Sequence, residues 1–169
     1  ASDVVQDAAD HVARAAAAEQ KVELYEYLGS LAGVTKFSIP EPMFNVLNGG
    51  KHAHNGLDIQ ECMLVPVGFA TISEKVAVAA ACVATLKKIL EEKAYGTEMG
   101  DEGGFAPAVG GNDEALELLM ASITGGGYTT EQIKIALDVA ASSIPNLDKE
   151  RMFDWYLAIA KKYPLLSIE

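Results

Sequence analysis

Cysteine is scarce in this sequence, since Cys62 and Cys82 are the only two among 169 residues. Both lie in apolar surroundings without a C-x-x-C spacing, which excludes a disulfide scaffold and predicts buried, free thiols in a reducing compartment. Basic residues are also few, 13 against 24 acidic ones, and the formal net charge is -11. Because the basic residues are scattered, we expect no nucleic-acid partner and no attraction to an anionic membrane surface.

Long hydrophobic runs are missing as well. The alanine-rich runs at 15–18 and 76–84 are flanked by charged residues and are too short to span a bilayer. No basic-then-apolar leader opens the sequence. We therefore expect a cytoplasmic protein without a membrane segment. Hydrophobic residues make up 50% of the chain, enough for the core of one domain of ordinary size.

Apolar strands alternate with amphipathic helices along most of the chain. This order predicts an α/β fold in which β/α units surround a parallel sheet, either an α/β barrel or a doubly wound sheet. We expect a helical segment over residues 1–38 and a partial barrel domain over 39–169. The expected later helices are 73–93, 112–123 and 148–162, the extended segments are 37–50 and 58–68, and the apolar strands are 133–138 and 165–169.

Two of the expected strands end in a carboxylate, Asp138 and Glu169. Barrel enzymes keep their chemistry at the carboxyl ends of the strands, so both acids are candidate site residues. Carboxylates that converge in an apolar mouth repel one another unless a cation lies between them, and oxygen ligands of this type suit Mg²⁺. The alternative is that each acid only caps the helix that follows it.

A glycine-rich stretch, GDEGGFAP at 100–107, carries two adjacent carboxylates on a bare backbone. Glycines allow a tight turn and let a carboxylate approach a ligand closely. Asp101 is predicted to bond local backbone amides as an Asx turn, which leaves Glu102 as the projecting acid. Taken alone, the stretch could equally be a simple turn.

Four segments follow one another along the chain: FNVLNGGKHAHNGLDIQE, MGDEGGFAP, IALDVAAS and YPLLSIE. In this order they resemble the successive signature segments of enolase, the glycolytic lyase that dehydrates 2-phosphoglycerate. The resemblance extends over most of the chain and implies the first part of an incomplete (β/α)8-type barrel, preceded by helices.

The resemblance implies roles for four residues of the acid half of the site. Glu102 corresponds to the glutamate that protonates the leaving hydroxyl, and Glu61 to the acid that works beside it. Gln60 resembles the glutamine that contacts the substrate. His52 is similar to the mobile-loop histidine near the substrate phosphate, and His54 has no family role that carries over.

The resemblance also implies a metal. Asp138 and Glu169 match two metal ligands of the family, and the cofactor is Mg²⁺. Removing the proton next to the carboxylate of 2-phosphoglycerate creates a highly charged intermediate that divalent ions neutralise, and hydroxide then leaves only if an acid protonates it. The product is phosphoenolpyruvate. Full-length members of the family form homodimers or larger oligomers.

The family pattern is not complete within these 169 residues. A third metal aspartate, the lysine that acts as general base and the arginine that holds the substrate have no counterpart. We therefore expect a central fragment of an enolase that is inactive alone. One alternative is a non-catalytic family remnant that acts as a binding or interaction module. Another is an independent metal-dependent enzyme of the wider superfamily, against which GDEGG argues.

Overall fold

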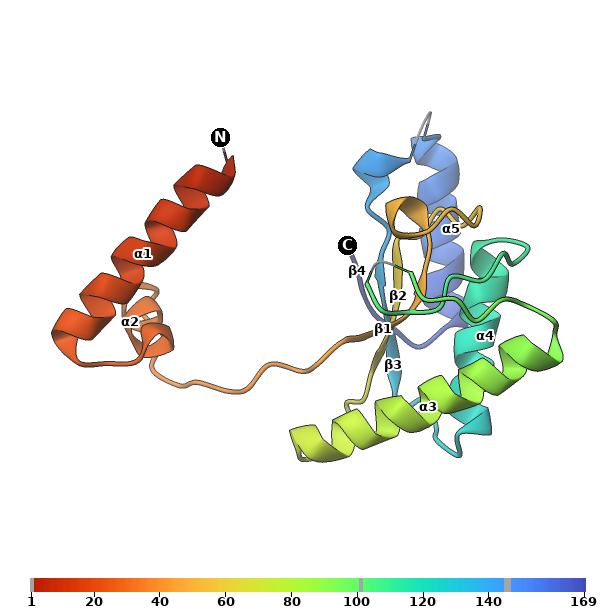
Figure 1. The fold of residues 1–169 in the computed structure, drawn as a ribbon, viewed down its shortest axis with the longest axis horizontal. Coiled ribbons are helices and arrows are strands. Elements are labelled where there is room, and N and C mark those ends of the chain that lie inside the picture. Colours follow the sequence, from red (N-terminus) through yellow and green to blue (C-terminus); the bar gives the residue numbers. More distant parts are fainter. Residues whose placement is uncertain (1, 101, 145–146) are drawn as a thin grey trace. The chain divides into compact units, whose positions relative to one another are not determined.

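The structure is a computed structural model that describes residues 2–100, 102–144 and 147–169. The Asx turn predicted at Asp101 lies outside these residues. Contacts divide the chain into a unit that ends at Pro40 and a second unit, Glu41–Glu169. The two units are described separately below, and Figure 1 shows the elements of each.

The first unit is a pair of helices, as the sequence predicts. Helix α1 spans Ser2–Gln20 and α2 spans Leu24–Leu31. The chain reverses between them at Lys21, whose φ of 57° is left-handed. A reciprocal capping box between Glu23 and Glu26 starts α2, because each side chain accepts a hydrogen bond from the other residue's backbone amide.

The second unit contains a four-stranded sheet with the order β1-β2-β3-β4. The prediction of a parallel sheet is wrong for two of its three strand pairs, since β1–β2 and β2–β3 are antiparallel and only β3–β4 is parallel. The connection between β1 and β2 has no crossover helix, and two helices rather than one join β2 to β3. The strands are Phe44–Asn48 (β1), Glu61–Val65 (β2), Lys134–Asp138 (β3) and Leu165–Ile168 (β4).

The antiparallel β2 changes which residues meet. Because β2 runs against its neighbours, it begins at the edge of the sheet where β1, β3 and β4 end. Asn48, Glu61 and Asp138 are consecutive partners across this edge. We call it the site edge, because the predicted site residues on strands β2, β3 and β4 lie at or next to it.

Three helices complete the second unit. Helix α3 spans Ile72–Glu92, α4 Asn112–Gly125 and α5 Lys149–Lys162, close to the predicted bounds. Thr71 and Glu74 form a capping box at the start of α3, and Asp148 caps α5. Helix α3 packs against α4, with the two helices crossing in Figure 1, and α4 contacts β2. The Trp155 indole N–H on α5 donates to the Asp113 carboxylate on α4 over 2.9 Å.

The core lies between the sheet and these helices. Both cysteines are buried and free, which confirms the prediction for the thiols. Burial raises the pKa of Cys62 to about 12 and that of Cys82 to about 11. Among the described helices, none combines the length and the apolar character that crossing a membrane would need. Large side chains with almost no exposed surface are Leu47, Ile59, Leu64, Leu86, Leu90, Leu116, Leu119, Ile123, Ile133, Ile135 and Leu137.

Candidate functional site

The backbone brings three predicted acids to the site edge. Glu61 and Asp138 are direct partners in the β2–β3 ladder. Glu169 follows β4, where its amide donates to Leu137 O over 2.9 Å and its carbonyl accepts from the Val139 amide over 3.0 Å. Backbone hydrogen bonds therefore fix the positions of these acids at neighbouring strand termini. The sequence led us to expect Asp138 and Glu169 at this edge, whereas Glu61 joins them because β2 is antiparallel.

The neighbouring acids affect the pKa of Glu61. Partial burial raises the pKa of the Glu61 carboxyl, and the negative charge of Asp138 raises it further. Glu102 and Glu169 add smaller contributions in the same direction, while His52 opposes them. Glu61 consequently keeps its proton to a higher pH than an ordinary glutamate, and Glu102 belongs to the same electrostatic cluster.

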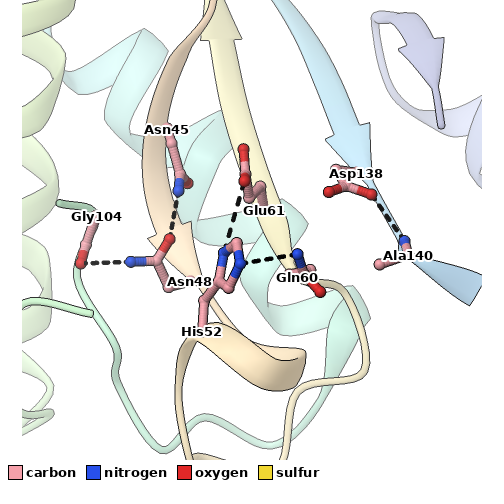
Figure 2. Close-up of polar contacts among 8 residues, drawn as sticks. All are labelled: Asn45, Asn48, His52, Gln60, Glu61, Gly104, Asp138 and Ala140. Atoms are coloured by element: carbon pink, nitrogen blue, oxygen red, sulfur yellow. Dashed lines mark hydrogen bonds and ion pairs between the residues drawn. The ribbon is translucent and has the colours of Figure 1, made fainter. Parts of the chain in front are cut away.

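His52 lies between Gln60 and Glu61, as Figure 2 shows. The short 3-10 turn Gly50–His52 carries the ring away from the end of β1. Its Nε2 is 2.8 Å from Gln60 Nε2, and its Nδ1 is 3.6 Å from Glu61 Oε1. With the amide nitrogen of Gln60 as donor, Nε2 accepts, and the neutral ring has its proton on Nδ1, facing Glu61. In the described part of the chain, this buried Nδ1 has no hydrogen-bond partner.

The glycine-rich stretch forms a closed turn beside β1. The Gly100 amide donates to Gly104 O over 2.7 Å, and the Gly103 amide donates to Gly100 O over 3.2 Å. Gly103 has a φ of +81°, a backbone conformation that residues with a side chain rarely adopt. A Cβ on Gly104 would lie 2.8 Å from the Val46 carbonyl carbon. These two positions therefore favour glycine, and Glu102, which directly precedes them, is exposed.

Two polar residues of β1 were not among the predicted site residues. Asn48 is completely buried and donates from Nδ2 to Gly104 O over 3.0 Å. Asn45 donates from Nδ2 to Asn48 Oδ1 (Figure 2). The available signal was an asparagine at the end of an otherwise apolar run, Val46–Asn48, because a buried amide in a strand needs a specific partner.

The predicted metal ligands supply oxygen donors only. Asp138 Oδ1 accepts from the Ala140 amide over 2.8 Å, which orients the carboxylate (Figure 2). Within residues 2–100, 102–144 and 147–169 there is no group of three or more His, Cys, Asp or Glu side chains placed to bind a metal. Asp138 and Glu169 fit a hard cation such as Mg²⁺ in donor type, but two carboxylates do not by themselves make a complete ligand set.

A hollow of about 340 Å³ lies next to Gln60. The β1–β2 connection forms one wall, with Lys51 and His54, and Ser143 and Ile144 form the other. A small polar molecule could enter here beside the site edge.

A comparison with known protein families matches residues 36–151 to the family described as "Enolase, C-terminal TIM barrel domain". The match includes His52, Gln60, Glu61, Glu102 and Asp138, covers more than half of the chain, and agrees with the observed α/β sheet. The chain belongs to the family of enolase C-terminal TIM barrel domains.

Proposed function

We propose that this chain carries the acid half of the active site of an enolase. The enzyme would be a cytoplasmic, glycolytic, Mg²⁺-dependent lyase that dehydrates 2-phospho-D-glycerate to phosphoenolpyruvate. The observation that carries the proposal is the placement of Glu61, Asp138 and Glu169 at one edge of the sheet, with the Glu102 loop joined to β1 at the same edge. Membership of the enolase family supports it independently.

The leaving group defines the work of the acids. Hydroxide departs from carbon only if a proton reaches it, so an acid must be protonated near neutral pH. Partial burial raises the pKa of the Glu61 carboxyl, and the negative charges of Asp138, Glu102 and Glu169 raise it further, so Glu61 is the acid of the cluster that holds its proton more tightly. In the proposal, Glu102 gives its proton to the leaving hydroxyl and Glu61 acts beside it.

Gln60 and His52 would bind the substrate. The Gln60 amide and the His52 ring contact one another, so a ligand that displaces this contact meets one amide donor and one imidazole. The imidazole Nδ1 faces Glu61, so its N–H is placed to donate to that carboxylate or to an acceptor atom of the ligand.

Mg²⁺ would be held in part by Asp138 and Glu169, with further ligands supplied from outside these 169 residues. When bound, the metal neutralises the negative charge that develops on the substrate carboxylate. At the site edge, the residues of this chain orient the substrate and deliver the proton to the leaving hydroxyl. We also propose that the full protein self-associates, as the family resemblance implies.

The test is an assay of 2-phosphoglycerate dehydration with Mg²⁺, following the absorbance of the enol product. The 169-residue chain is measured alone and after mixing with a separately expressed C-terminal barrel segment of an enolase, which supplies the general-base lysine. We expect no activity alone and activity after mixing. Glu102→Gln should abolish the restored activity, because the amide keeps the shape of the acid and has no proton to give.

Two results would contradict the proposal. Activity of the chain alone would mean that another residue acts as the base. Restored activity that Glu102→Gln leaves unchanged would remove Glu102 from the mechanism. Silence in both arms, with binding of the two chains shown by sedimentation, would favour the alternative of a non-catalytic interaction module.

A further inference from the structure

Asn48 is the last residue of β1 and has 0% of its surface exposed. An amide without hydrogen-bond partners is destabilising at a buried position, and an aliphatic side chain would fill the same space without that penalty. The residue faces Glu61 across the β1–β2 ladder. Its presence at the site edge therefore calls for a specific role.

Both polar atoms of the Asn48 side chain are used. Oδ1 accepts from Asn45 Nδ2, which fixes the orientation of the amide and directs Nδ2 away from Asn45. Nδ2 donates to Gly104 O over 3.0 Å, and the same carbonyl accepts from the Gly100 amide over 2.7 Å. The side chain thus binds the carbonyl that closes the turn around Glu102.

Packing reinforces this hydrogen bond at both ends of the turn. A Cβ on Gly100 would lie 2.3 Å from Asn48 Nδ2, so the backbone of Gly100 rests directly on the amide. After Gly104 the chain joins β1, because the Phe105 amide donates to Val46 O over 2.9 Å and the Asn48 amide donates to Phe105 O over 2.8 Å. The turn is therefore attached to β1 through backbone and side chain together.

The β1–β2 connection, which begins directly after Asn48, is joined to the same network of hydrogen bonds. The Asn55 side chain donates from Nδ2 to Asn48 O over 2.8 Å and to Pro107 O over 3.0 Å. Asn55 lies in the β1–β2 connection that also carries His52. One end of β1 consequently links the segment of His52 with the segments on both sides of Glu102.

We propose that Asn48 is a positioning residue that fixes the Glu102 turn at the site edge, opposite Glu61. Asn48 acts through the Gly104 carbonyl and does not touch the reacting groups. Since Glu102 is the acid only under the proposed function, the effect on catalysis rests on that function, whereas the effect on the turn does not.

The first test is hydrogen exchange of the 169-residue chain, read at individual amides. Asn48→Ala removes the donor to Gly104 O, and Asn48→Leu removes it without leaving a cavity or burying a charge, so the second variant decides if the first does not fold. We expect the amides of Gly100 and Gly103 to exchange about tenfold faster relative to those of β2.

Ser122→Ala is the matched control. Ser122 is also completely buried, and its hydroxyl donates to Leu119 O over 2.8 Å inside α4. Its loss removes one buried side-chain hydrogen bond to a backbone carbonyl and should leave exchange at Gly100 and Gly103 unchanged. Equal exchange at these amides in wild type and in both Asn48 variants would overturn the proposal.

The second test uses the complemented dehydration assay. We expect Asn48→Leu to lower kcat about tenfold with an unchanged KM, because the substrate contacts from Gln60 and His52 remain, and Ser122→Ala to change neither. A raised KM with an unchanged kcat would overturn the positioning role. Faster exchange of the turn, combined with full activity of Glu102→Gln, would support the attachment of the turn and refute the proposed function instead.

Discussion

Replacing Gly104 by alanine tests how closely the acid-bearing turn must approach β1. A Cβ at this position would lie 2.8 Å from the carbonyl carbon of Val46, 3.0 Å from the amide nitrogen of Leu47 and 3.1 Å from Val46 O. All three are backbone atoms of the buried part of β1, so no flexible side chain can move aside. The turn itself has to shift away from β1.

The size of the effect follows from two opposing terms. Overpacking of this kind lowers the free energy of unfolding by about 1–3 kcal/mol. Alanine also restricts the unfolded chain more than glycine does, which stabilises by about 0.4–1 kcal/mol. We therefore expect Gly104→Ala to lower the free energy of unfolding by roughly 1–2 kcal/mol. Urea denaturation followed by circular dichroism measures this value.

Gly110→Ala provides the control within the same connecting segment. A Cβ on Gly110 would meet only the carboxylate oxygen Oε2 of Glu114, 3.0 Å away. This side chain can shift by a few tenths of an ångström, but its hydrogen bonds with the Gly110 amide and the Tyr95 hydroxyl would weaken, so a small steric cost offsets the entropic gain. We expect this variant to be as stable as wild type or slightly more stable. If Gly104→Ala and Gly110→Ala have the same urea midpoint, the close approach of the turn to β1 is refuted.

Three further predictions concern titration and thiol reactivity. The raised pKa of Glu61 means that the native state binds this proton more tightly than the unfolded chain does. Ionised Glu61 therefore destabilises the fold as the pH rises above the ordinary carboxyl pKa. Glu61→Gln should raise the urea midpoint at neutral pH and have no effect at low pH. The Lys162 ammonium lowers the pKa of Glu117, so this pair stabilises the fold at neutral pH and the contribution is lost on acidification. Glu117→Gln should flatten the acid side of the plot of unfolding free energy against pH. An unchanged plot would contradict the pairing of α4 with α5. Cys62 and Cys82 should not react with a thiol reagent in the native chain and should react fully in denaturant, because both are buried and their pKa values are raised; fast native labelling would refute the described core.

The helices were the most predictable part of the fold. The sequence-based start of α3 at Ser73 lies two residues after its cap, Thr71, and that of α5 coincides with its cap, Asp148. Capping and apolar periodicity depend on residues close together in the sequence. Local interactions of this kind can be recognised without a fold. The acids at the strand ends were predictable for a similar reason, because each closes a short apolar run.

The direction of the strands was not predictable from the same patterns. An apolar strand of five residues reads alike in a parallel and an antiparallel pair, so periodicity could not show that β2 runs against β1 and β3. This reversal decides the register between Asn48, Glu61 and Asp138. It also explains how Glu61, at the start of its strand, meets acids that stand at the ends of theirs.

The sequence by itself determined the chemistry of this protein: the types of residue, the glycines that permit the acid turn and the motifs that resemble enolase. The tertiary structure alone decided the role of Asn48, because its hydrogen bond to Gly104 joins residues that are 56 positions apart. It also decided the raised pKa of Glu61, whose causes include burial and charges on three other segments. Burial and long-range contacts depend on the packed chain, and no local pattern records them.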